Sequence, residues 1–160
     1  MLTRDRANST IATIAEIREF LGDRLSTAAS VREQHGKDQT WNPGPAPDAV
    51  AFVQSTAEVQ EIVSLCNLHH VPVIPYGTGT SLEGHFSAPY GGISIDLNGM
   101  KSILEVNPED LDCRVEAGVT RKELNSHLRD TGLFFPIDPG ADASLGGMTA
   151  TRASGTNAVR

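Results

Sequence analysis

The sequence predicts an α+β fold made of α/β lobes, and three features carry the prediction. A strand, a capped helix and a second strand follow one another between residues 50 and 74, which is the order of a βαβ unit with parallel strands. A glycine-rich loop at 75–85 follows the second strand, at the carboxyl edge where such units gather their ligands. Two further strands flank a turn between residues 103 and 117, in the pattern of a β-hairpin.

Composition and charge narrow the class of protein further. The 160 residues suffice for one domain with its own core, and the net charge of −7 argues against nucleic acid as a partner, since phosphate contacts need a basic surface. The apolar runs are too short for a membrane span. Acidic residues near the N-terminus are unlike a secretory signal, and they weaken a mitochondrial transit peptide without removing it. We expect a cytoplasmic protein in which Cys66 and Cys113 are reduced.

The N-terminal part is predicted to hold one helix and a linker. Apolar residues at near-helical spacing after a Ser9-Thr10 cap predict an amphipathic helix over 9–25. The stretch 35–49 holds three prolines and two glycines, which predicts an ordered loop or linker. Trp41 in this stretch is expected to be a packing anchor.

The βαβ unit begins with a short strand at 50–53. Ser55 and Glu58 then have the spacing of a capping box, in which the serine oxygen accepts from the third helical amide while the glutamate reaches back. Residues 71–74 form the second predicted strand, directly before the glycine-rich loop.

The chain after the loop continues with strands and one capped helix. Residues 92–97 have the alternation of a strand, and the hairpin at 103–117 turns through Asn-Pro-Glu-Asp. Thr120 and Glu123 form a second capping box. The helix that they open is predicted to stop at Gly132, a residue type typical of the position after a helix end.

The loop at 75–85, PYGTGTSLEGH, interleaves three glycines with hydroxyl side chains. Glycine allows another group to approach the backbone closely, and hydroxyls add donors for an anion such as a phosphate. The absence of lysine excludes the Walker pattern, and Leu82 stands where the dinucleotide fingerprint needs its third glycine. Taken alone, the loop is either a phosphate cradle of another kind or a tight connection whose glycines serve geometry.

A second unusual region runs from Asp138 to Asn157 and consists mainly of small side chains. Asp138, which stands before a Pro-Gly pair, is expected to set an Asx turn. Such a segment cannot form its own core, and it makes sense where its backbone lies close to a flat or crowded partner. The alternative is close helix packing through Gly146, Gly147 and Ala150. The two regions together favour a large ligand that combines a diphosphate with a flat ring system.

The five histidines give no catalytic pattern. His69 and His70 close the predicted helix, where a cation favours the dipole. His85 adjoins the glycine-rich loop, His127 is expected on a solvated helix face, and His35 has no assigned role. No Ser/His/Asp or Cys/His arrangement emerges, so neither a catalytic residue nor a metal site is predicted in this chain.

Three stretches together resemble the FAD-linked D-lactate dehydrogenases, a group that includes the flavin subunit of bacterial glycolate oxidase. They are the loop PYGTGTSLEGH, the stretch VREQHGKDQTWNPGPAPDAV and the C-terminal run VTRKELNSHLRDTGLFFPIDPGADASLGGMTATRASGTNAVR. The resemblance implies an FAD-binding domain of the vanillyl-alcohol-oxidase (PCMH) type, with two α/β lobes that clasp the cofactor. It places this domain at 43–160, incomplete at the C-terminus, after an N-terminal helix and linker at 1–42.

The resemblance also assigns cofactor-binding residues to the two unusual regions. The loop would hold the FAD diphosphate by backbone amides through Tyr76, Gly77, Thr78, Gly79, Thr80, Ser81, Leu82 and Gly84. The second region would let backbone approach the isoalloxazine and ribityl groups through Asp138, Pro139, Gly140, Ala141, Ser144, Leu145, Gly146, Gly147, Thr151, Ser154, Gly155 and Asn157. Related branches attach flavin covalently through a histidine of a Gly-Gly-His motif, whereas His85 follows Leu-Glu-Gly, so FAD is expected to be bound non-covalently.

The function implied by the resemblance is that of a flavin-dependent D-2-hydroxyacid dehydrogenase. Such an enzyme oxidises D-lactate, or a similar acid such as glycolate, to the 2-oxo acid by hydride transfer to FAD. In the family, the divalent metal, the base and the substrate cap domain belong to a part that follows the equivalent of Arg160, so this chain is expected to be inactive by itself.

Two alternatives remain at this point. The chain is either part of such an enzyme or a non-catalytic FAD-binding or partner-binding module from a split or degraded gene. A relative on the same scaffold, such as an alkyl-glycerone-phosphate synthase, fits the quoted stretches less well than the lactate group does. The sequence predicts neither the particular acid nor the electron acceptor.

Overall fold

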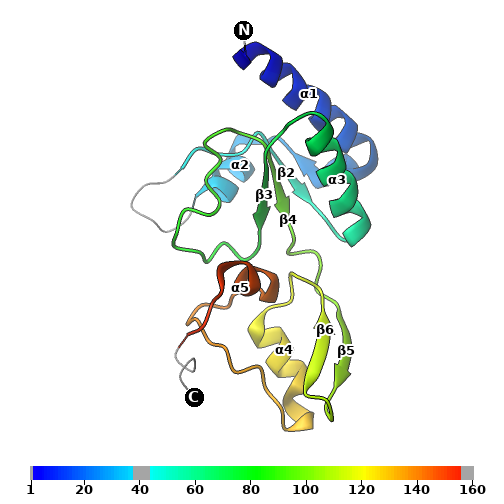
Figure 1. The fold of residues 1–160 in the computed structure, drawn as a ribbon, viewed down its shortest axis with the longest axis vertical. Coiled ribbons are helices and arrows are strands. Elements are labelled where there is room, and N and C mark those ends of the chain that lie inside the picture. The colour runs from blue at the N-terminus through cyan, green and yellow to red at the C-terminus, as the bar shows by residue number, and fades with distance from the viewer. Residues whose placement is uncertain (1, 38–43, 156–160) are drawn as a thin grey trace.

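Two lobes of unequal size make up the computed structural model, which describes residues 2–37 and 44–155 (Figure 1). The larger lobe contains the N-terminal helices and a four-stranded sheet, and the smaller lobe contains a hairpin and two helices. This mixture of helices and strands confirms the predicted α+β class. Trp41 lies outside the described residues, as does the predicted boundary between residues 42 and 43, so that division of the chain stays a prediction.

The larger lobe is built around one sheet. Its elements are α1 (Leu2–Leu21), the 3-10 helix η1 (Gly22–Arg24), β1 (Leu25–Ser26), α2 (Ala29–Gly36), β2 (Ala49–Phe52), α3 (Thr56–Leu68), β3 (Val73–Tyr76) and β4 (Ile93–Asp96). The strands lie in the order β1-β2-β4-β3, with β1 antiparallel to β2 and with β2 and β3 both parallel to β4. Phe52 and Tyr76 both lie beside Asp96 in this register, so three strands end at one edge, which faces the smaller lobe (Figure 1).

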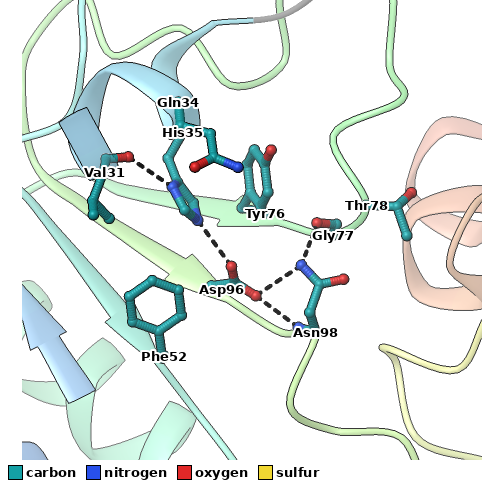
Figure 2. A pocket seen from close by; sticks show the side chains of 9 residues that line it. All are labelled: Val31, Gln34, His35, Phe52, Tyr76, Gly77, Thr78, Asp96 and Asn98. Carbon is teal, nitrogen blue, oxygen red and sulfur yellow. Dashed lines mark hydrogen bonds and ion pairs between the residues drawn. The ribbon is translucent and has the colours of Figure 1, made fainter.

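The two faces of this sheet differ in chemistry. One face packs against α1 and α3, where Ile17 and Ile62 join Ile93 and Ile95 in an apolar core. The other face carries α2, and the buried His35 of this helix lies against Asp96 at the end of β4 (Figure 2). Because both faces are covered, β4 is buried along its whole length.

The βαβ unit is confirmed with two changes, one in the order of its strands and one in the start of β3. Ser55 caps α3 by accepting from the backbone N–H of Glu58 at 3.3 Å, and the Glu58 carboxylate reaches back to the backbone N–H of Gln54 at 2.8 Å. The two strands run parallel, as predicted, but β4 lies between them. β3 starts later than predicted because the N–H of Val71 is still bonded to the carbonyl of Cys66 at the end of α3.

The smaller lobe begins with the predicted hairpin. Its elements are β5 (Ile103–Asn107), β6 (Asp112–Val115), α4 (Arg121–Leu128), the 3-10 helix η2 (Arg129–Thr131) and α5 (Leu145–Thr151). β5 and β6 pair antiparallel, with a register irregularity between Ile103 and Glu105. Its core is small, with Val119, Leu124 and Leu128 as the buried members.

The second capping box and the helix stop in this lobe are both confirmed. Thr120 and Glu123 make both reciprocal hydrogen bonds of the box at the start of α4. Gly132 ends η2 with φ of 74°, a left-handed conformation that costs glycine little.

The N-terminal helix differs from its prediction at both ends. α1 begins at Leu2, and Ser9 lies inside it, where its carbonyl accepts from the Thr13 hydroxyl at 2.9 Å. The predicted Ser9-Thr10 cap is therefore wrong. Both residues lie inside the helix, where the Thr10 hydroxyl donates to the carbonyl of Arg6, one turn earlier, instead of capping the helix start. The helix stops at Leu21 because Gly22 takes a positive φ of 56°.

The linker predicted at 35–49 is wrong at its start, since His35 and Gly36 are the last residues of α2. The residue before this helix, Ala28, makes no side-chain cap, so the usual start signal is missing. None of the helices in the part of the chain that the structure describes is both long and apolar enough to cross a membrane.

Candidate cofactor site

The glycine-rich loop leaves β3 at the carboxyl edge of the sheet and passes α5 (Figures 1 and 2). Within the described residues, no backbone N–H from Thr78 to Glu83 donates to a backbone carbonyl. The Thr78 and Thr80 hydroxyls lie 3.2 Å apart. Successive N–H groups without backbone partners, set among hydroxyls, are what a bound anion needs. The loop therefore fits a diphosphate such as that of FAD.

Two glycines of the loop hold conformations that other residues disfavour. Gly79 has φ of 71°, and a Cβ placed on it would lie 2.4 Å from the Tyr76 hydroxyl. Gly84 has φ of 73°, and among the described residues a Cβ there would meet nothing within 4 Å. Gly79 thus lies close over Tyr76, and both glycines hold a left-handed backbone that other residues rarely adopt.

The second region forms a turn and then α5. Asp138 accepts from the backbone N–H of Gly140 at 2.9 Å, which confirms the predicted Asx turn. Buried Ser144 caps α5 by accepting from the N–H of Gly147 at 3.3 Å. A Cβ on Gly146 would lie 2.8 Å from Ala117, so close packing explains this glycine whether or not a ligand binds.

Gly77 and Ser144 bring the two regions together. A Cβ on Gly77 would lie 2.5 Å from the Ser144 hydroxyl oxygen, so the loop backbone rests directly on the start of α5. The two regions that the sequence singled out, far apart in the chain, therefore meet between the lobes. An FAD site shared by the two regions requires this proximity, and the site itself stays a prediction.

The remaining predicted residues differ in exposure. Tyr76 is buried beneath the loop, with its ring 4.2 Å from the His35 ring and 5.0 Å from the Phe86 ring, centroid to centroid. Asn157 lies outside the described residues. Exposed or half-buried positions are taken by Thr78, Gly79, Thr80, Ser81, Leu82, Gly84, Asp138, Pro139, Gly140, Ala141, Leu145, Gly147, Thr151, Ser154 and Gly155. Their contact with FAD stays a prediction.

A hollow of about 400 Å³ beside the loop exposes a hydrogen-bonded chain that the sequence did not predict (Figure 2). His35 Nε2 lies 2.8 Å from Asp96 Oδ2. Asp96 Oδ1 accepts from the backbone N–H and the side-chain amide of Asn98, at 2.8 and 2.9 Å. The same amide donates to the carbonyl of Gly77 at 2.6 Å, which is the first residue of the loop after β3. Part of this arrangement had a signal in the sequence, because Asp96 ends a buried strand and Asn98 follows it, at the edge where ligands gather.

The surroundings of His35 favour its charged form. Its Nδ1 lies 2.8 Å from the carbonyl of Val31, one helical turn earlier, and its Nε2 lies 2.8 Å from a side-chain oxygen of Asp96. A carbonyl and an ionised carboxylate only accept, so both contacts are hydrogen bonds when His35 is an imidazolium and both of its ring nitrogens donate. Burial lowers the pKa of His35, but the hydrogen bonds to Asp96 and Val31 outweigh it and raise that pKa above its usual value. Burial, with the Asp96 charge, also raises the pKa of the Tyr76 hydroxyl.

No group of three His, Cys, Asp or Glu side chains within residues 2–37 and 44–155 lies close enough to hold a metal ion. His85, beside the loop, is exposed, and its Nδ1 is hydrogen-bonded to the Ser81 hydroxyl.

Comparison with known proteins also indicates an FAD-binding domain. The model of a family described as "FAD binding domain" matches residues 47–160. A zebrafish protein named "Probable D-lactate dehydrogenase, mitochondrial" is 51% identical over 148 residues, which cover 92% of this chain and 30% of that protein. An Arabidopsis thaliana protein named "D-lactate dehydrogenase [cytochrome], mitochondrial" is 46% identical over 149 residues, covering 92% of this chain and 26% of that protein.

Solved structures show the same fold. An alkyldihydroxyacetonephosphate synthase superposes with a TM-score of 0.82 at 26% identity, over 91% of this chain and 32% of that one. The predicted vanillyl-alcohol-oxidase (PCMH) type is confirmed by such neighbours. The chain spans about 30% of the length of the curated relatives that it matches. Within that span, it belongs to the FAD-binding domain family and is a homologue of the D-lactate dehydrogenases.

Proposed function

We propose that this chain is the FAD-binding part of a flavin-dependent D-2-hydroxyacid dehydrogenase, with D-lactate as the first substrate to test. The observation that carries the proposal is the contact between Gly77 and Ser144, which joins the loop to the turn and helix at 138–151. Among the described residues, the backbone N–H groups from Thr78 to Glu83 have no backbone carbonyl partner. Homology to D-lactate dehydrogenases supports the choice of acid. Glycolate is the alternative acid.

The chain's own residues would act by binding and orientation. The N–H groups from Thr78 to Glu83 would donate to the diphosphate and stabilise its negative charge by hydrogen bonds, without a lysine. The backbone around Gly140 and Gly147 would accept the flatter part of the cofactor. FAD, when bound, supplies the acceptor for the hydride that leaves C2 of the acid. No described residue of this chain is assigned as the base that takes the hydroxyl proton.

Three finer points belong to the same proposal. FAD is expected to be non-covalent, so it should be released by acid precipitation, and flavin that stays on the protein would point to His85. Any divalent metal is expected to be held by residues outside this chain. Location in the cytosol is proposed from composition, whereas both named relatives carry "mitochondrial" in their names.

The test is anaerobic reduction of the flavin in the complete polypeptide that the gene encodes, after loading with FAD and desalting. D-lactate should bleach the flavin absorbance, and L-lactate at the same concentration should not. Flavin that is retained but not bleached by either D-lactate or glycolate would favour the alternative, a non-catalytic FAD-binding or partner-binding module. Protein that retains no flavin would contradict both the dehydrogenase and the FAD-binding module, and would favour a module that binds only a partner.

A further inference from the structure

The hydrogen-bonded chain beside the hollow ends on the loop, and this is the feature from which we infer a further role. Asn98 bridges Asp96 and Gly77 through one side-chain amide, at 2.9 and 2.6 Å. The Gly77 carbonyl is thereby fixed, and with it the plane of the peptide that carries the Thr78 N–H. Thr78 is the first of the loop residues whose N–H groups have no backbone partner in the part of the chain that the structure describes.

His35 lies at the other end of this series of hydrogen bonds, which runs through Asp96 and Asn98 to Gly77. Its side chain is 4% exposed and that of Asp96 is 8% exposed, so the ion pair is well shielded from water. With His35 on one oxygen of Asp96 and Asn98 on the other, the carboxylate cannot rotate. A buried charged group of this kind is costly unless every partner is in place, so a small change at His35 is felt at Asn98.

A second line of contact runs from His35 to the same loop. The His35 ring lies against the ring of Tyr76, at 4.2 Å between centroids. The Tyr76 hydroxyl lies directly beneath Gly79, where it would be 2.4 Å from an added Cβ. His35 is therefore coupled to Gly77 through hydrogen bonds and to Gly79 through packing.

We propose that His35, Asp96 and Asn98 are positioning residues that fix the backbone of the loop, so that its N–H groups are held ready for the diphosphate of FAD. The proposal rests on the proposed function for the identity of the ligand. The physical reason for such an arrangement is that N–H groups arranged before binding cost little ordering entropy when the ligand arrives. None of the three side chains needs to touch the cofactor.

The molecule contains a matched control. His69 Nε2 lies 2.9 Å from Glu16 Oε1, which is the same type of pair at nearly the same distance. This pair joins α3 to α1, away from the loop, and it is partly exposed. Replacing His69 removes the same chemistry without reaching Gly77.

The test uses the complete polypeptide and four variants: His35→Asn, Asn98→Ala, their combination, and the control His69→Gln. The FAD dissociation constant is measured by quenching of flavin fluorescence. We expect His35→Asn and Asn98→Ala each to weaken FAD binding by about tenfold or more, the lower end of the effect of removing residues that orient a binding group in metal sites. His69→Gln should leave the constant unchanged. Because His35 and Asn98 belong to one series of hydrogen bonds, the double variant should lose little more FAD affinity than either single variant.

A readout without FAD separates this inference from the proposed function. In protein with isotopically labelled glycine, the amide resonances of Gly77 and Gly79 should shift or broaden in His35→Asn and in Asn98→Ala, but not in His69→Gln. If wild-type protein binds no FAD while these resonances respond as expected, the proposed function fails and the positioning role stands. If FAD affinity and the glycine resonances stay unchanged in Asn98→Ala, a variant of a half-buried side chain, the positioning role is wrong. Strictly additive losses in the double variant would likewise overturn the coupling.

Discussion

The two faces of the four-stranded sheet carry the same kind of side-chain pair in different surroundings. On the side of α1 and α3, His69 and Glu16 pair at the rim of an apolar core, with side chains 25% and 41% exposed. On the side of α2, His35 and Asp96 pair beneath the loop and are almost fully buried. The first face needs no polar group for its packing. The second face holds a charged pair in a buried place, where charge is costly. We therefore assign this pair to the positioning of the loop and not to a gain in stability.

The largest difference between the two faces should appear when one partner of each pair is removed. Asp96→Ala leaves the His35 imidazolium buried without a partner, so we expect the free energy of unfolding to fall by about 3–5 kcal/mol. Glu16→Ala should lower it by about 0–1 kcal/mol, since exposed pairs contribute little. Urea unfolding of both variants measures the difference, and equal losses would mean that the faces do not differ as described.

On the apolar face, a substitution should lower the free energy of unfolding without weakening FAD binding. Ile62 is fully buried among α1, α3 and the sheet, so Ile62→Ala should lower the free energy of unfolding by about 2–5 kcal/mol. At a temperature where the variant is still folded, its FAD dissociation constant should match that of wild type. A clear loss of FAD affinity would show that the apolar face also controls the loop.

Two glycines with matching backbone give a finer comparison. Gly84 has φ of 73° and Gly132 has φ of 74°, and an added Cβ meets no atom of residues 2–37 or 44–155 within 4 Å at either. Alanine at each should cost about 1–2 kcal/mol of stability through the left-handed conformation alone. Only Gly84→Ala should also weaken FAD binding, because only Gly84 lies in the loop. Flavin fluorescence titration of the two variants checks this, and equal affinities would remove Gly84 from the site.

The smallest effect expected is a pH dependence of the buried pair. The pKa of His35 is raised in the folded state above its usual 6.5, because the hydrogen bonds to Asp96 and Val31 outweigh burial. The stabilisation is therefore complete below pH 6.5 and is lost as pH rises through the folded-state pKa. The difference in unfolding free energy between wild type and His35→Asn should shrink over that range in urea titrations. A difference that grows with pH would contradict the assignment.

Local signals predicted the local structure well. The Thr120–Glu123 box, the stop at Gly132 and the Asx turn at Asp138 depend on hydrogen bonds within a few residues, and the structure contains all of them. The glycine-rich loop was predicted because glycine and hydroxyl spacing reflects backbone requirements directly. The resemblance then joined it to the region beginning at Asp138, and the structure brings both together.

Long-range pairing set the limit of prediction. β4 lies between β2 and β3 although it follows both in the chain, and no local pattern encodes that insertion. His35 remained without a role because α2 has no capping side chain and because its partner, Asp96, lies 61 residues away. Tyr76 was assigned to the ligand-facing loop, whereas its ring is buried beneath it against His35 and Phe86.

The most direct test of the central claim, that the loop and the start of α5 form an FAD site, is the visible absorbance spectrum of the purified protein after incubation with FAD and removal of free cofactor. We predict that wild type retains flavin absorbance and that Gly132→Ala does so equally, whereas Gly84→Ala retains less. A wild-type protein that is folded but colourless would contradict the claim.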